Sequence, residues 1–173
     1  MSGSGQHARG DSRTGVLFVC LGNICRSPLA KGLFQDLIRT KGVADQFDID
    51  SCGTGGWHEG QGADPRTMQI AAFHGLTFEH AARRLDPRRD FDRFHYLLAM
   101  DLDNKAGLLH AGAPANKVHL IRSFDPALRD ESEHRLQVPD PYYGGSEGFE
   151  KMYVMLKAAC EGFLDHTIAN QRN

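Results

Sequence analysis

A cysteine and an arginine separated by five residues stand between an apolar run and a helical pattern. Cys20 follows the run 16–19, and Arg26 is followed at once by Ser27 and Pro28. The run is typical of a short buried strand, and the apolar spacing after Pro28 is that of a helix. Ser27 is a good N-cap, and proline suits the first helical position. Such a strand–loop–helix unit directs loop N–H groups and the positive end of a helix dipole toward one point, which favours an anion.

This arrangement suits nucleophilic chemistry on a phosphate group. Free cysteine has a pKa of about 8.5, and a helix N-terminus with a nearby arginine lowers a thiol pKa to roughly 3.5–7.5, so we expect Cys20 to be a thiolate. The planar fork of Arg26 fits two phosphate oxygens. A lone cysteine at a strand end is more often a small buried hydrophobic residue, but that alternative leaves the rest of the constellation unexplained. The phosphate-binding amides would be those of Leu21, Gly22, Asn23, Ile24, Cys25 and Arg26.

Composition limits the class of protein. The chain has 173 residues, 40% of them hydrophobic and 24% charged, and a net charge of −2. We therefore expect one domain with a real core and no general affinity for nucleic acid or anionic membranes. No apolar run approaches the ~18 residues of a membrane helix, and residues 1–15 lack the apolar core of a signal peptide. Four cysteines are few for a secreted scaffold, so we expect a cytoplasmic protein; secretion without a signal peptide stays open.

The remaining patterns predict an α/β fold. Residues 1–15 read as a disordered leader or a remnant of cloning, and 16–171 as a single domain. We expect helices covering both faces of a four-stranded, mostly parallel sheet, with ligands bound beyond the carboxyl ends of the strands. The predicted strands are 16–20, 46–52, 94–100 and 118–121, and the predicted helices are 28–41, 63–74, 101–110 and 146–170.

A second candidate for chemistry is Asp140, which lies between two prolines in the segment 138–145. The prolines restrain the backbone around it. A phenol, with a pKa of ~10, leaves poorly as an anion, and a carboxylic acid that protonates it contributes about 10²–10⁴-fold. The alternative is that Asp-Pro simply marks a turn. Tyr142, Tyr143 and Trp57 would form aromatic walls suited to a phenyl ring, although core packing is the alternative for Trp57.

The loop from Cys20 to Ser27 and the Asp-Pro-Tyr-Tyr segment at 140–143 resemble those of the low-molecular-weight protein tyrosine phosphatases. The resemblance covers about residues 16–163. It implies hydrolysis of phosphotyrosine in proteins, and of small aryl phosphates, through a cysteinyl-phosphate intermediate, without a metal or cofactor. In that reading Cys20 is the nucleophile, Arg26 stabilises the transition state and Asp140 is the general acid and base.

Supporting residues follow from the same segments. We expect Ser27 to donate a hydrogen bond to the Cys20 thiolate and Asn23 to lock the loop. The resemblance implies Ser51 and His80 as partners of that network; a surface histidine is the alternative for His80, and the other histidines are interpreted as ordinary surface or core residues. Cys25 is either a buried loop residue or, as the resemblance implies, a thiol that forms a reversible disulfide with oxidised Cys20.

Two rival functions use the same residues. A thiol-dependent arsenate reductase of the same fold would need further redox cysteines, and Cys52 and Cys160 do not form a close pair in the sequence. A non-catalytic phosphotyrosine-binding module would be expected to lack one of Cys20, Arg26 or Asp140. The expected partner is a phosphotyrosine-containing protein, with a tyrosine kinase as one candidate, and phosphate-like oxyanions should inhibit. The sequence leaves open the physiological substrate, the oligomeric state and the role of residues 1–15.

Overall fold

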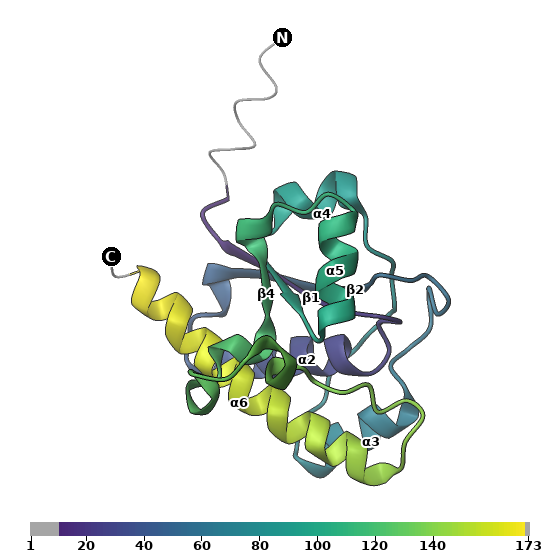
Figure 1. Cartoon of the computed structure of the whole chain (residues 1–173). Coiled ribbons are helices and arrows are strands. Elements are labelled where there is room, and N and C mark those ends of the chain that lie inside the picture. Colours follow the sequence, from purple (N-terminus) through teal and green to yellow (C-terminus); the bar gives the residue numbers. More distant parts are fainter. Residues whose placement is uncertain (1–10, 172–173) are drawn as a thin grey trace.

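The computed structural model describes residues 11–171, which form an α/β fold around one four-stranded sheet (Figure 1). All four strands are parallel, in the order β2-β1-β3-β4. The prediction of an α/β fold with a four-stranded sheet is confirmed. The sheet was predicted to be mostly parallel, and in the structure all of its strands are parallel. The strands are β1 (Thr14–Cys20), β2 (Phe47–Gly53), β3 (Tyr96–Ala99) and β4 (Val118–Leu120).

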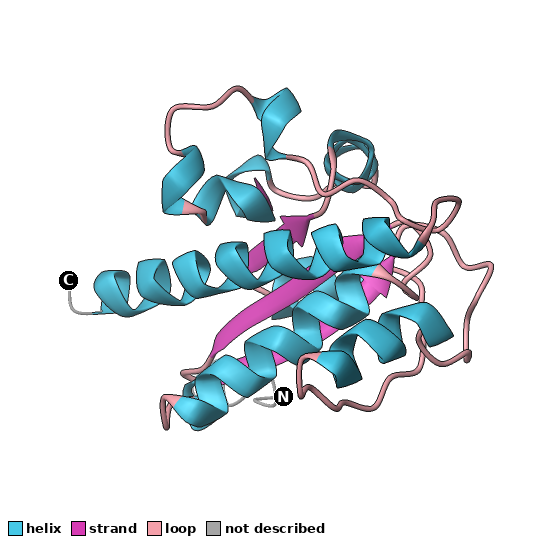
Figure 2. Cartoon of the chain, turned by 90° about the horizontal axis from the view of Figure 1, so that it is seen from below, coloured by secondary structure: helices cyan, strands magenta, loops and turns pink. Residues whose placement is uncertain are grey.

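Helices cover both faces of the sheet, as predicted. Helices α2, α3 and α6 contribute side chains to the apolar cluster on one face of the sheet, and α4 and α5 contribute to the cluster on the other face. Figure 2 shows α2 and α6 lying against the sheet. Within residues 11–171, no helix has the length and apolar character needed to cross a membrane. The helices are α2 (Arg26–Thr40), α3 (Pro65–Phe73), α4 (Pro87–Arg93), α5 (Leu102–His110) and α6 (Ser146–Gln171).

The apolar run in β1 is continuous because the strand is buried on both faces. Val16 and Phe18 pack into the cluster that includes α2 and α6, whereas Leu17 and Val19 pack into the cluster on the opposite face. All four side chains have no exposed area. A central parallel strand alternates between two apolar environments, so its sequence shows no polar alternation. This burial fixes β1 rigidly, and with it the position of Cys20 at its carboxyl end.

Several predicted boundaries needed correction. Strand β1 begins at Thr14, so residues 14 and 15 belong to the sheet rather than to the expected leader; residues 1–10 of that leader lie outside the described residues. Helix α2 begins at Arg26, two residues before the predicted start. Ser27 is therefore inside the helix, and Cys25 holds the N-cap position without any side-chain cap. The prediction of Ser27 as N-cap is wrong, because its hydroxyl has a different partner.

Helix α4 was not predicted at all. Its N-cap Asp86 accepts a hydrogen bond from the backbone of Arg88, and Pro87 occupies the first helical position. The same start signals stand at α3, where Asp64 caps and Pro65 follows; that helix was predicted at 63–74 and spans Pro65–Phe73. Helix α4 has seven residues and only one apolar side chain, Phe91, so no helical periodicity accompanies the cap. Its stability comes from packing and ion pairs with distant segments.

Candidate active site

The loop between β1 and α2 lies at the carboxyl edge of the sheet. Cys20 is paired with Gly53 at the end of β2, and the backbone N–H groups of Thr54 and Gly55 donate to the carbonyls of Cys20 and Leu21 at 2.9 Å each. A Cβ at Gly53 would stand 2.7 Å from the carbonyl oxygen of Leu21. The loop thus packs so closely against the end of β2 that only glycine fits there.

Asn23 is the structural centre of the loop. It has a φ of 59°, the only positive value among the described non-glycine residues, and it has no exposed area. Asparagine tolerates this left-handed region better than most residues. Its backbone carbonyl accepts a hydrogen bond from His80 Nε2 at 2.6 Å, and its Oδ1 accepts the backbone N–H of Arg83 at 2.9 Å. Its Nδ2 donates to Ser27 Oγ at 2.8 Å and to Ser51 Oγ at 3.0 Å.

These bonds decide what the Ser27 hydroxyl does. Because Asn23 Oδ1 is used by a backbone N–H, its amide nitrogen must face Ser27 and donate to it. The single hydroxyl hydrogen of Ser27 is then free to point at Cys20 Sγ, 2.9 Å away, rather than at the carbonyl of Cys52 at 3.5 Å. The backbone N–H of Asn23 also donates to the sulfur at 3.3 Å. Two donors directed at one sulfur stabilise negative charge on it.

Arg26 is buried, with 2% of its surface exposed, and its guanidinium is held by three acceptors. One terminal nitrogen donates to Asp101 Oδ2 at 2.6 Å and to the carbonyl of Val138 at 2.9 Å, and the other lies 3.7 Å from Asp140 Oδ2. Burial acts to lower the pKa of Arg26, but the neighbouring charges, with Cys20 and Asp101 the largest, outweigh it and the net pKa is raised. The arginine stays charged and its orientation is fixed.

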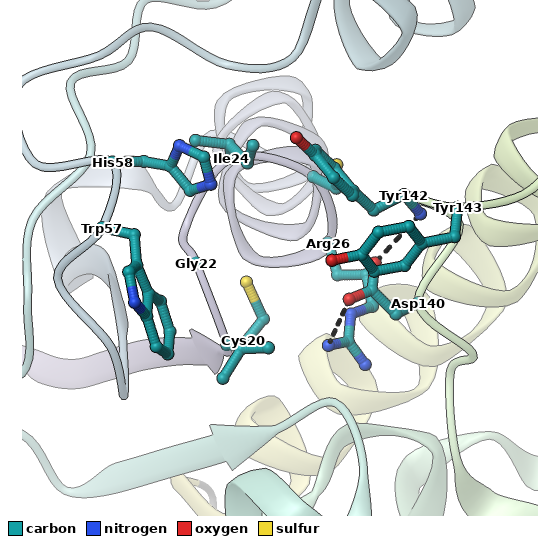
Figure 3. Close-up of a pocket in the computed structure, with 11 residues that line it drawn as sticks. Cys20, Gly22, Ile24, Arg26, Trp57, His58, Asp140, Tyr142 and Tyr143 are labelled. Carbon is teal, nitrogen blue, oxygen red and sulfur yellow. Dashed lines mark hydrogen bonds and ion pairs between the residues drawn. The ribbon is translucent and has the colours of Figure 1, made fainter.

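Cys20, Arg26 and Asp140 meet in one cavity of about 280 Å³. Figure 3 shows the sulfur at the base, with the guanidinium and the Asp140 carboxylate to one side and Trp57 on the opposite wall. Tyr142 and Tyr143 follow Asp140 along the rim, and Tyr142 N donates to Asp140 Oδ1 at 3.1 Å. The predicted loop residues that line the cavity are Leu21, Gly22, Ile24 and Cys25.

The aromatic residues are exposed, with 71% of Trp57, 36% of Tyr142 and 93% of Tyr143 accessible. Core packing is therefore excluded for Trp57. Rings that are exposed over a cavity are available to a ligand, so these side chains form an apolar entrance above a charged base.

The structure brings together every predicted site residue, in two groups. Asn23, Ser27, Ser51 and His80 form the hydrogen-bonded network behind the loop, and the others line the cavity. His80 is half-buried, so its interpretation as a plain surface histidine is wrong. Burial lowers its pKa, and its Nδ1 is buried without a partner, so the neutral ring donates through Nε2.

Two residues were missed from the sequence. The sequence around Asp101 predicts only the start of a helix; in the structure Asp101 caps α5 through Oδ1, which accepts the N–H of Asn104 at 2.7 Å, while Oδ2 accepts a hydrogen bond from Arg26. His58, expected to be an ordinary histidine, lines the cavity, and its ring centroid lies 6.3 Å from that of Tyr142. The available signal for Asp101 was its position directly after a buried strand, where ligands of parallel sheets gather.

The four cysteines are all buried and unpaired. Burial raises the pKa of Cys25 to about 12, and it also raises the pKa values of Cys52 and Cys160. Cys52 packs on the face of the sheet opposite to Cys20, and Cys160 lies in the core against α2. Neither is placed to relay electrons to Cys20. Among residues 11–171, no group of three or more His, Cys, Asp or Glu side chains is arranged to hold a metal ion.

Comparisons with known proteins agree over most of the chain. A model of the family "Low molecular weight phosphotyrosine protein phosphatase" matches residues 15–173. A low molecular weight protein-tyrosine-phosphatase of Streptomyces coelicolor is 45% identical over 152 residues, 86% of this chain and 90% of that protein. A crystal structure of a protein tyrosine phosphatase from Entamoeba histolytica has a TM-score of 0.83 and 34% identity, covering 91% of this chain and 99% of its own. A crystal structure of a drosophila arginine phosphatase has a TM-score of 0.78 and 32% identity, and the match covers 88% of this chain and 97% of that chain.

The fold, the loop at its sheet edge and these relatives define an α/β phosphatase, a hydrolase. More particularly, the chain belongs to the low-molecular-weight phosphotyrosine protein phosphatase family. The resemblance inferred from the sequence is confirmed.

Proposed function

We propose that this protein hydrolyses phosphotyrosine in proteins, and small aryl phosphates, through a cysteinyl-phosphate intermediate. The observation that carries the proposal is the convergence of Cys20, Arg26 and Asp140 in one cavity with an aromatic entrance. The sulfur supplies a nucleophile, the arginine a fixed positive charge, and the carboxyl group a proton at the side from which the leaving group departs.

The first step transfers the phosphoryl group to sulfur. The Cys20 thiolate forms a bond to phosphorus while the bond from phosphorus to the tyrosyl oxygen breaks, and Asp140 gives its proton to that oxygen. Charge on the equatorial oxygens is stabilised by the loop N–H groups and the Arg26 guanidinium, which Asp101 holds in place. The Ser27 hydroxyl stabilises the sulfur in its charged form.

The second step releases phosphate. Asp140, now a carboxylate, removes a proton from a water molecule as the water attacks phosphorus. The sulfur–phosphorus bond breaks and Cys20 leaves as a thiolate, again stabilised by the donors from Ser27 and Asn23. The domain that performs this chemistry is 16–171, extended by the two β1 residues before it.

The aromatic entrance favours phosphotyrosine over shorter phosphoamino acids. Trp57 and Tyr142 line the cavity from different sides above a charged base, which suits a flat ring that carries its phosphate at the far end. Phosphate-like oxyanions such as vanadate should bind at the base and compete. The physiological substrate is then a phosphotyrosine protein, a tyrosine kinase being one candidate, and we propose that it is met in the cytoplasm.

The test is a comparison of substrates and variants. Wild-type protein should release phosphate from phosphotyrosine peptides, and much more slowly from phosphoserine and phosphoarginine peptides of matched sequence. Cys20→Ser should show no turnover. Asp140→Asn should be slow on phosphotyrosine and less impaired on aryl phosphates whose leaving groups need no proton. Turnover of phosphoarginine alone would contradict the proposal, as would thiol-dependent reduction of arsenate without phosphatase activity.

We also propose that Cys25 protects Cys20 from irreversible oxidation. Both side chains lie in the same loop and line the same cavity. Peroxide would oxidise Cys20 to a sulfenic acid, and the Cys25 thiol would displace water from it to form a disulfide, which an added dithiol reduces. Activity lost to peroxide should return with dithiothreitol in wild type but not in Cys25→Ala. Equal recovery in both proteins would exclude this role.

A further inference from the structure

Arg66 in α3 lies between two aromatic rings near the cavity, outside the set of residues that line it. Its guanidinium carbon is 5.5 Å from the ring centroid of Tyr142 and 4.6 Å from that of Phe149. Both distances are within the ~6 Å over which a cation is attracted to the face of an aromatic ring. Tyr142 follows Asp140 in the rim segment, and Phe149 is a buried residue near the start of α6. Arg66 therefore touches the segment that carries the proposed general acid.

The same guanidinium is linked to the Cys20 loop through Asp64. Asp64, 7% exposed, accepts two hydrogen bonds from the guanidinium, at 3.1 Å from Nε and 2.9 Å from a terminal nitrogen. The backbone N–H of Asp64 donates in turn to the carbonyl of Ile24 at 2.8 Å. A bidentate pair fixes the plane of the guanidinium as well as its position. A chain of direct contacts thus runs from Ile24 through Asp64 and Arg66 to Tyr142.

The segment at 140–145 is anchored by Pro141, which is buried and whose carbonyl accepts the N–H of Gly144 at 3.0 Å, but the residues after it are exposed. Tyr143, Gly144 and Gly145 are exposed, and the Asp140 carboxylate is held by its 3.7 Å contact to Arg26 and by the N–H of Tyr142. A carboxyl group that must protonate a leaving oxygen needs its position held closely, because proton transfer depends on hydrogen-bond distance. Contact with the Tyr142 ring restrains the residue whose N–H is bonded to Asp140.

We propose that Arg66 is a positioning residue for the general acid, holding Tyr142 and thereby Asp140 at a fixed place over the Cys20 loop. Lysine would replace it poorly, since an ammonium group cannot both pair with Asp64 through a planar fork and lie flat against a ring. This inference rests on the proposed function, because it assigns a role within that reaction.

The experiment compares leaving groups in Arg66→Ala, Arg66→Lys and a control, Arg88→Ala, an exposed arginine with no ion pair among the described residues. On phosphotyrosine, whose phenol has a pKa of ~10, Arg66→Ala should lower kcat/KM, which reports formation of the phosphoenzyme, about tenfold, a part of the 10²–10⁴-fold that a general acid contributes. On 2,4-dinitrophenyl phosphate, whose phenolate leaves without a proton, kcat/KM should change less than about twofold. Arg66→Lys should fall between wild type and Arg66→Ala, and Arg88→Ala should match wild type.

A double variant separates positioning from general destabilisation. In a Tyr142→Leu background the ring contact is already lost, so adding Arg66→Ala should cause no further loss of kcat/KM on phosphotyrosine. Equal losses on both leaving groups, or additive losses in the double variant, would overturn the inference. In either of those outcomes the wild-type protein still hydrolyses phosphotyrosine, so only the role of Arg66 is rejected. A wild-type protein without turnover would overturn the proposed function itself.

Discussion

Replacing Asp101 with asparagine removes one of two oxygens that the side chain uses at the same time. Oδ1 accepts the N–H of Asn104 at the start of α5, and Oδ2 accepts from Arg26. An asparagine that keeps the cap turns its NH₂ group toward the guanidinium, where two donors face each other. Because asparagine is as good an N-cap as aspartate, helix α5 should persist, and the change acts on Arg26.

The size of the effect follows from the bond that is lost. A hydrogen bond between charged groups contributes about 1.5–3 kcal/mol, and each 1.36 kcal/mol is tenfold in rate. If Arg26 stabilises the transition state only when correctly oriented, Asp101→Asn should lower kcat/KM on an aryl phosphate by about 10- to 100-fold. Affinity for vanadate should fall in parallel, measured by competitive inhibition.

A matched control lies two residues further along the helix. Asp103 is exposed and stands in the same first turn of α5, so Asp103→Asn changes the charge equally without touching Arg26. It should retain activity within about twofold of wild type, as expected of an exposed charge. An Asp101→Asn variant as active as Asp103→Asn would show that Arg26 is oriented without this carboxylate, and the reasoning would fail.

Three further outcomes are expected. Ser27→Ala should slow breakdown of the phosphoenzyme more than its formation, seen as a larger burst of phenol release, because Cys20 Sγ loses a donor at 2.9 Å as it leaves; an unchanged burst would count against this. Iodoacetamide at pH 7 should modify Cys20 and not Cys25, whose pKa burial raises to about 12, as peptide mapping would show; rapid labelling of Cys25 would be inconsistent with its burial. Burial lowers the pKa of His80 from its ordinary 6.5, so as pH falls the unfolded chain binds a proton at this histidine before the folded protein does. The free energy of unfolding should therefore be highest above about pH 6.5 and should decline below it. His80→Gln, which still donates to the carbonyl of Asn23, should flatten the pH dependence of the urea midpoint, and an equally steep dependence would refute the assignment.

The sequence alone determined the features that depend on neighbours along the chain. A doubly buried strand is a continuous apolar run, so β1 and Cys20 at its end were recognisable from residues 16–20. The helix that follows, the stop at Gly42 with its positive φ and the Asp-Pro start of α3 are also local signals. Asp140 was recognisable because two prolines flank it and because its segment resembles that of a known family.

Only the tertiary structure decided which distant side chains complete the site. Arg26 and Asp101 are 75 residues apart, and no spacing rule relates them; they meet because β1 and β3 are neighbours in the sheet and both end at the same edge. Ser27 reads as a helix cap in the sequence, but the curl of the loop brings its hydroxyl to the sulfur instead. Strands, helices and their ends can be predicted from the sequence because apolar residues recur with the period of the element and because caps involve neighbouring residues. Contacts between elements depend on strand order and register, which the packing of the whole core sets.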